Sequence, residues 1–115
     1  MRRILIVLAA TLLAAAPALA HHGWGAYDAK NVLTIDTKLD SIRYANPHAE
    51  AQITYEGETW NVVLAPVTRM TARGLPDGAL AAGKQVTIVG YPRTDGTREI
   101  RAENITVDGK KVELR

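Results

Sequence analysis

Apolar and polar residues alternate one by one along several stretches of this chain, a pattern typical of β-strands with one buried face. The clearest stretch is 48–55, where every second residue from Ala49 faces one side of the predicted strand. Glu56-Gly57 is a tight-turn signal, so residues 59–65 are predicted to pair back as the second strand of a hairpin. This pattern favours a mainly β domain.

The same alternation predicts four further strands, at residues 32–44, 85–91, 98–107 and 111–114. In two of these strands the alternation shifts by one residue, at Asp40-Ser41 and between Ala102 and Ile105. Each shift predicts a bulge or sharp bend at that point. Bends of this kind are what the closing of a small barrel requires. The residues expected in the core are Ile53, Val62, Leu64, Val86 and Ile88.

One short helix is predicted between the strands. Pro66 suits a first helical position and Gly74 suits a helix end, so about two turns are expected between them. A helix after the third of five strands is the element order of an OB-fold barrel. We therefore expect a small five- to six-stranded antiparallel OB-like barrel with one short helix. The alternative is an open antiparallel sheet with a helix on one face.

The first 20 residues have the layout of a secretory signal peptide. Arg2 and Arg3 precede an apolar run at residues 4–15, and Ala18 and Ala20 form a small-x-small cleavage signal. A retained membrane anchor is the less favoured alternative, because the run is shorter than the roughly 20 residues of a membrane span. We expect a periplasmic or secreted protein with no stable membrane anchor after cleavage. The predicted segments are the signal peptide (1–20), an amino-terminal arm (21–31) and the OB-like β-barrel domain (32–115).

Charge and cysteine content exclude several kinds of site. After residue 20 the chain carries 12 Lys and Arg against 12 Asp and Glu, so the mature protein has no basic surplus with which to bind nucleic acid. The chain has no cysteine, which rules out disulfides, thiolate metal sites and cysteine nucleophiles. Any metal ligands must come from His, Asp, Glu or the amino terminus.

The three histidines are the candidate metal ligands. Cleavage after Ala20 makes His21 the first residue, and its α-amine and ring Nδ1 can then chelate one metal ion together. His48 is the expected partner, because it follows the turn at Pro47 and shares the polar face of its predicted strand with Glu50. His22 could replace either histidine or supply a fourth nitrogen. Three nitrogen donors in a near-planar arrangement suit copper, so we expect Cu(II) as the metal.

Three functions remain open from these residues. The first is a periplasmic copper-binding protein, a carrier or sensor in preference to an enzyme, with a periplasmic protein considered as a further partner. The second is a non-metal binding module that recognises a protein or a saccharide on the barrel face. The third is a copper-dependent oxidase. No Ser-His-Asp spacing, phosphate-binding glycine loop or metalloprotease motif is present.

Aromatic and basic residues near these candidates have simpler interpretations. Trp24 and Tyr27 are interpreted as residues that pin the arm onto the barrel, although they could also shield a metal or stack on a sugar. Arg93, Arg98 and Arg101 are interpreted as ordinary surface charge.

Several motifs resemble those of a family of small exported bacterial proteins, catalogued as domain of unknown function 6152. The resemblance covers essentially the whole chain after residue 20, and Trp24 and the strand around Trp60 depart from the family's usual residues. It implies export and a compact β domain, and it implies no activity. The motifs that carry it are His21-His22, Tyr27-Asp28, Asn46-Pro47-His48, Gly90-Tyr91-Pro92, Asp95-Gly96 and Asp108-Gly109.

Overall fold

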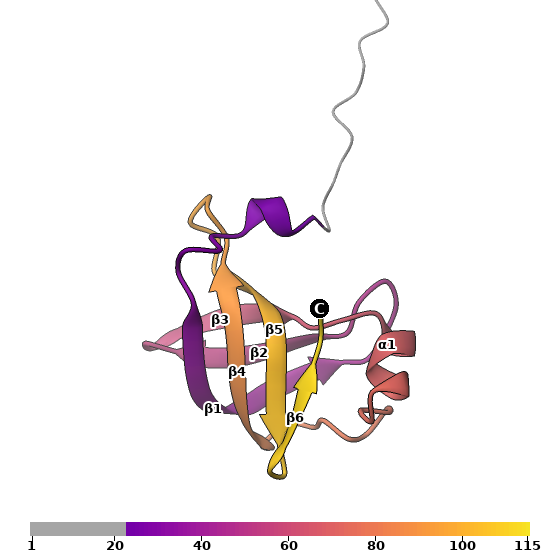
Figure 1. Cartoon of the computed structure of the whole chain (residues 1–115). Helices are drawn as coiled ribbons and strands as arrows, with labels where there is room; N and C mark the ends of the chain where they lie inside the picture. Colours follow the sequence, from indigo (N-terminus) through magenta and orange to yellow (C-terminus); the bar gives the residue numbers. More distant parts are fainter. Residues whose placement is uncertain (1–22) are drawn as a thin grey trace, which may run out of the picture.

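The computed structural model describes residues 23–115 of the chain (Figure 1). The predicted signal peptide and the candidate ligands His21 and His22 lie outside the described residues. Within residues 23–115, no helix has the length and apolar character that crossing a bilayer requires.

Six strands form one sheet in the order β3-β2-β1-β4-β5-β6, and an additional pairing of β3 with β5 closes the first five strands into a barrel. The sixth strand, β6, extends the sheet beyond β5. The OB-like barrel is therefore the observed fold, and the open sheet is not. The strands are β1 (Leu33–Arg43), β2 (Glu50–Tyr55), β3 (Glu58–Val63), β4 (Gln85–Pro92), β5 (Glu99–Val107) and β6 (Lys110–Glu113).

The expectation of a purely antiparallel barrel is wrong at one junction. The β3–β5 pair is parallel, with Asn61 beside Glu99 and Val63 beside Arg101, while the other pairs are antiparallel. The reason is geometric. Strand directions cannot alternate all the way around a closed ring of five strands, so at least one neighbouring pair must run the same way.

Both predicted bends are present as register shifts. The pairing of β1 with β2 shifts between Leu39 and Ser41, and the pairing of β4 with β5 shifts between Val89 and Gly90. Gly90 is required at the second shift, because a side chain there would collide with the backbone oxygen of Arg101. These bends let β1 and β5 each pair with different neighbours along their length.

The predicted helix is α1 (Val67–Ala72), which begins directly after Pro66. Its residue Met70 is fully buried in the core. The β1–β2 loop holds the helix, since the Tyr44 hydroxyl lies 2.9 Å from the Leu75 carbonyl oxygen and 2.8 Å from the Thr71 hydroxyl. In Figure 1 the helix accordingly lies beside that loop, at one side of the barrel.

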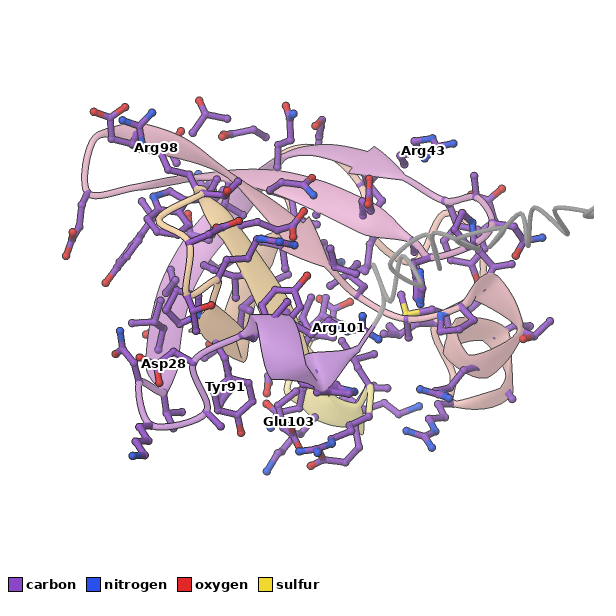
Figure 2. All side chains as sticks on the ribbon, turned by 90° about the horizontal axis from the view of Figure 1, so that it is seen from above. Asp28, Arg43, Tyr91, Arg98, Arg101 and Glu103 are labelled. Atoms are coloured by element: carbon purple, nitrogen blue, oxygen red, sulfur yellow. The ribbon has the colours of Figure 1, made fainter. Side chains whose placement is uncertain are left out.

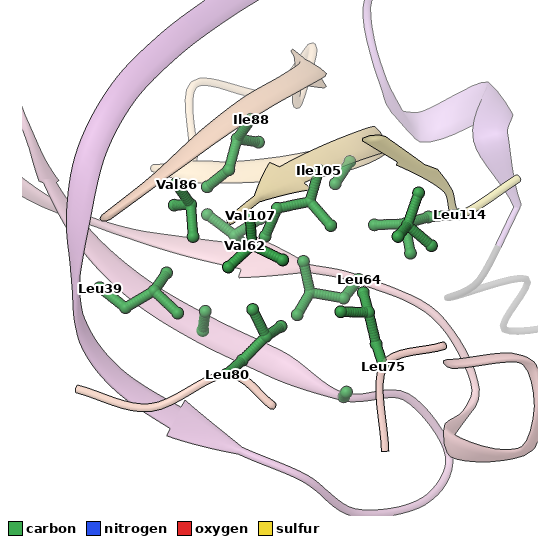
Figure 3. Close-up of a cluster of buried hydrophobic side chains, with 14 of the residues drawn as sticks. Leu39, Val62, Leu64, Leu75, Leu80, Val86, Ile88, Ile105, Val107 and Leu114 are labelled. Atoms are coloured by element: carbon green, nitrogen blue, oxygen red, sulfur yellow. The ribbon is translucent and has the colours of Figure 1, made fainter. Parts of the chain in front are cut away.

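The core fills the inside of the barrel with aliphatic side chains from every strand (Figure 3). The five residues expected there are all buried, which confirms the predicted parity of their strands. Because the inner face is filled, a ligand site must lie on the outer surface or at the loops.

Candidate functional site

The amino-terminal arm, residues 23–31, lies against the end of β4 and the loop that follows it. A short 3-10 helix, η1 (Trp24–Ala26), opens the arm, and Tyr27 then forms an isolated antiparallel bridge with Arg93. Beside this bridge, the Asp28 N–H donates to the Pro92 carbonyl at 2.8 Å. Figure 1 shows the arm, in indigo, crossing one end of the barrel. The arm is therefore part of the folded domain and not a frayed terminus.

Tyr27 anchors the arm through a carboxylate. Its side chain is only 5% exposed, and its hydroxyl donates to Glu99 Oε2 at 2.8 Å. The same carboxylate accepts hydrogen bonds from Asn61 Nδ2 at 3.2 Å and from an Arg93 Nη at 3.2 Å. Burial raises the pKa of the Tyr27 phenol, and the bond to Glu99 raises that pKa further. The phenol is therefore protonated, and available as a donor, throughout the neutral range.

Arg101 also lies under the arm, and its interpretation as surface charge was wrong. It is only 5% exposed. Strand parity does place it on the outer face of β5, because its neighbours Ile100 and Ala102 point into the core. The arm covers that face: the guanidinium carbon of Arg101 lies 4.8 Å from the centroid of the Trp24 ring. Figure 2, seen from above, shows Arg101 beside η1. Burial lowers the pKa of the guanidinium, and the proximity of Tyr27 opposes that shift.

The two other arginines of that group are paired at the surface. Arg93 forms salt bridges with Asp95 and Glu99, both at 3.2 Å, and Arg98 pairs with Glu58 at 3.3 Å. Arg98 therefore agrees with its interpretation as ordinary surface charge, whereas Arg93 is half-buried and bonds the carboxylate that anchors the arm.

A pocket of about 230 Å³ lies on the outer surface of the barrel, between the arm, the β1–β2 loop and the start of β5. In OB folds the outer face of β2 and β3, with the β1–β2 and β4–β5 loops, is the surface that binds oligonucleotides and oligosaccharides. The pocket occupies the same place. Its lining residues are Tyr27, Pro47, His48, Glu50, Val63, Arg93 and Glu99.

His48 lines this pocket. The prediction that a strand starts at His48 was wrong by two residues, since β2 begins at Glu50. Ala49, which lies between His48 and Glu50, is fully buried. Its N–H donates to the Ala65 carbonyl at 2.8 Å, and its carbonyl accepts from the Leu64 N–H at 2.9 Å. Because successive side chains of extended chain point to opposite sides, His48 and Glu50 both point away from the core. The structure thus brings His48, Glu50 and Tyr27 to one pocket.

The described residues do not complete a metal site. Among residues 23–115, no three His, Cys, Asp or Glu side chains are grouped so that they could hold a metal ion. A metal at His48 therefore needs donors from elsewhere, and the candidates His21 and His22 lie outside the described part of the chain.

Sequence reasoning missed Glu99 and Asn61 as members of this site. The side chains of Tyr27 and Glu99 meet over a separation of 72 residues, and those of Asn61 and Glu99 over 38. No local pattern could indicate such contacts: the second depends on the parallel closure of the barrel, and the first on the bridge between Tyr27 and Arg93. The shared face of His48 and Glu50 was, by contrast, visible from alternation alone.

Comparison with known families agrees with the resemblance seen in the motifs. The sequence model of a family of unknown function, DUF6152, matches residues 9–102. The chain belongs to this family. No curated protein sequence matches it. In this DUF6152 protein the matched segment contains every residue that lines the pocket, whereas β6 lies beyond it.

Replacing Tyr27 by Phe tests the anchor. We expect the free energy of unfolding to fall by about 1 kcal/mol, the usual net contribution of one hydrogen bond, because Glu99 keeps its two other donors. Urea denaturation measures the change. Tyr91→Phe is the matched control, since Tyr91 is half-buried at the edge of the Trp24 ring, and it should change stability by less than about 0.5 kcal/mol. Equal effects of the two substitutions would contradict an anchoring role for the Tyr27 hydroxyl.

Proposed function

We propose that this DUF6152 protein is a small exported Cu(II)-binding protein, a carrier or sensor, cut before His21. The α-amine and ring Nδ1 of His21 chelate the metal, and the His48 imidazole supplies the third nitrogen. His22 is a secondary donor. The observation that carries the proposal is that His48 and Tyr27 line the same pocket. Tyr27 belongs to the arm whose first residue would be His21.

The arm connects His21 to the pocket through a short length of chain. His21 precedes Tyr27 by six residues, of which Trp24–Ala26 are held in η1. Tyr27 is fixed at the pocket by its hydrogen bond to Glu99 and by the bridge to Arg93. The arm thus starts from a fixed point beside His48, which lowers the entropic cost of bringing His21 to the same metal ion.

Charge and donor type also favour a cation at this pocket. Two carboxylates, Glu50 and Glu99, line it against one guanidinium, that of Arg93, which also pairs with Asp95. Imidazole and amine nitrogens bind Cu(II) more strongly than the other divalent ions of the first transition row. Copper must displace the protons of these donors, whose reference pKa values are roughly 6.5 for His and 7.7–8 for an α-amine, so binding should weaken as the pH falls below about 6.5.

The position of the pocket supports the binding module as a second candidate. It lies where OB folds hold oligosaccharides or other extended ligands, and Tyr27 gives it an aromatic wall. Copper titration separates the two candidates, because a module of this kind needs no metal. Formation of peroxide that depends on added reductant would instead point to the copper-dependent oxidase.

The test uses protein purified from the periplasm, with intact mass measured to show the loss of residues 1–20. We expect one Cu(II) per chain in competition titrations, and His48→Ala should weaken binding at least about tenfold because one nitrogen ligand is lost. Gln52→Ala is the control, since Gln52 is exposed on β2 and does not line the pocket. A native-terminus protein that binds no copper would contradict the proposal and leave the module.

A further inference from the structure

We infer that the amino-terminal arm is a lid over the outer face of β5, and that a latch, residues 113–115, holds this lid closed. When the latch opens, the arm lifts. Lifting of the arm takes Tyr27 away from the wall of the pocket and exposes Arg101, which is buried in the closed form. Residues 23–115 alone carry this inference, which does not depend on copper.

One tryptophan ring links the arm to the latch. The guanidinium carbon of Arg115 lies 4.5 Å from the centroid of the Trp24 ring, and that of Arg101 lies 4.8 Å from the same centroid. Tryptophan is the aromatic side chain that attracts cations most strongly. Arg115 also pairs with Glu103 of β5 at 3.6 Å. Trp24 is therefore held by two arginines, one from the latch and one from β5.

The latch is itself held by the helix α1. Arg69 donates a hydrogen bond to the Leu114 carbonyl at 3.0 Å. Arg73 donates to the carbonyls of Glu113 and Arg115, at 2.6 and 3.1 Å. The Leu114 side chain is buried in the core. Figure 1 shows the latch, in yellow, between the arm and α1. The latch thus connects α1 to the arm across one end of the barrel.

The arm buries little of its own surface. Tyr27 is the one buried residue among residues 23–31, and η1 is three residues long with no side-chain cap. Two backbone hydrogen bonds, to Pro92 and Thr94, attach the arm to the end of β4 and the loop after it. Segments with few buried apolar contacts open locally, at a free energy well below that of global unfolding. The stacking of Trp24 is therefore a large share of what keeps the arm closed.

Opening of the arm changes the groups beside the pocket. Arg101 of β5 is paired with Val63 of β3, and Val63 lines the pocket. An open arm would therefore expose the Arg101 guanidinium next to the pocket and remove the Tyr27 phenol from it. Water can then solvate the guanidinium, and this hydration offsets part of the free energy of the lost contacts. The arm thus controls which groups the pocket offers to a ligand.

Amide hydrogen exchange, followed by NMR with no metal added, tests the latch. The reporters are the Asp28 N–H, which donates to the Pro92 carbonyl, and the Thr94 N–H, which donates to the Ala26 carbonyl. Both are protected only while the arm is closed. In Arg115→Ala both should exchange at least about threefold faster, the effect expected from the loss of one cation–π contact.

Arg73→Ala tests the link to α1. Within residues 23–115 the side-chain hydrogen bonds of Arg73 go to the latch and not to the arm. The same two amides should nevertheless exchange at least about twofold faster in this variant, because the latch loses a support. Arg98→Ala, an exposed arginine paired with Glu58, is the matched control and should leave them unchanged. The amide of Ile88, in β4, reports on unfolding of the whole barrel and separates that effect from opening of the arm.

A second measurement follows Arg101 directly. Phenylglyoxal reacts with exposed guanidinium groups, and mass spectrometry of the digested protein locates the modified arginines. Arg101 should be modified faster in Arg115→Ala than in Arg98→Ala. Unchanged exchange of the two reporter amides in Arg115→Ala would overturn the inference. Faster exchange in Arg115→Ala but not in Arg73→Ala would also overturn it, since the latch would then not depend on α1. Neither measurement involves copper, so the inference and the proposed function fail independently of each other.

Discussion

Extending the mature amino terminus by Gly-Ser-Pro is expected to weaken Cu(II) binding at least about tenfold, equivalent to about 1.4 kcal/mol. The extension converts the α-amine of His21 into an amide, which removes one nitrogen of the terminal chelate while every side chain stays in place. Competition titration against a chelator of known affinity measures the effect. A one-residue extension is unsuitable, because it places His22 third in the chain, where the new amine, two amides and the imidazole form a different copper chelate. Proline directly before His21 blocks such amide ligation.

The extended protein also supplies its own control. A longer extension that contains a protease site ending directly before His21 can be removed, which restores the native terminus in the same preparation. Copper affinity should then return to that of the protein that begins at His21. Equal affinities before and after cleavage would contradict the terminal chelate, and the binding module would become the better explanation.

Truncating Leu64 to Ala is expected to cost about 2–5 kcal/mol of unfolding free energy, the range for buried aliphatic side chains. Leu64 is fully buried and follows β3 directly, at the point where its N–H bonds to Ala49 (Figure 3). Urea denaturation monitored by circular dichroism measures the loss. Thr59→Ala, an exposed position on β3, is the control and should stay within about 0.5 kcal/mol of wild type. A cost for Leu64→Ala as small as that of the control would place Leu64 outside the core.

Local signals in the sequence were enough to predict the strands, the helix and both bulges. Alternation reports which face of a strand is buried, and a dipeptide such as Glu56-Gly57 reports a turn, since both depend on residues that are close in sequence. The helix predicted between Pro66 and Gly74 is observed as α1 for the same reason. These signals also placed Glu50 on the outer face with His48.

Features that depend on contacts between distant segments could not be predicted in the same way. The parallel β3–β5 pair follows from closure of an odd-numbered ring, which no single segment encodes. Arg101 was wrongly interpreted as surface charge because the arm buries it. Trp24 of the arm packs on Arg101 and precedes it by 77 residues in the sequence. Glu99 was missed because a glutamate at the start of a strand has the same local pattern whether it is solvated or anchors a distant tyrosine.

The anchoring of the arm by Glu99 sets an order of events for a chain that crosses a membrane with its amino terminus first. Tyr27 would emerge early, but its hydrogen-bond partner lies 72 residues further along and emerges near the end of transport. Until then the arm has no fixed place on the barrel, and His21 and His48 are joined only by flexible chain. Under the proposed export, high-affinity copper capture would begin only once translocation is almost complete, so the compartment that receives the protein would also determine the copper supply that loads it.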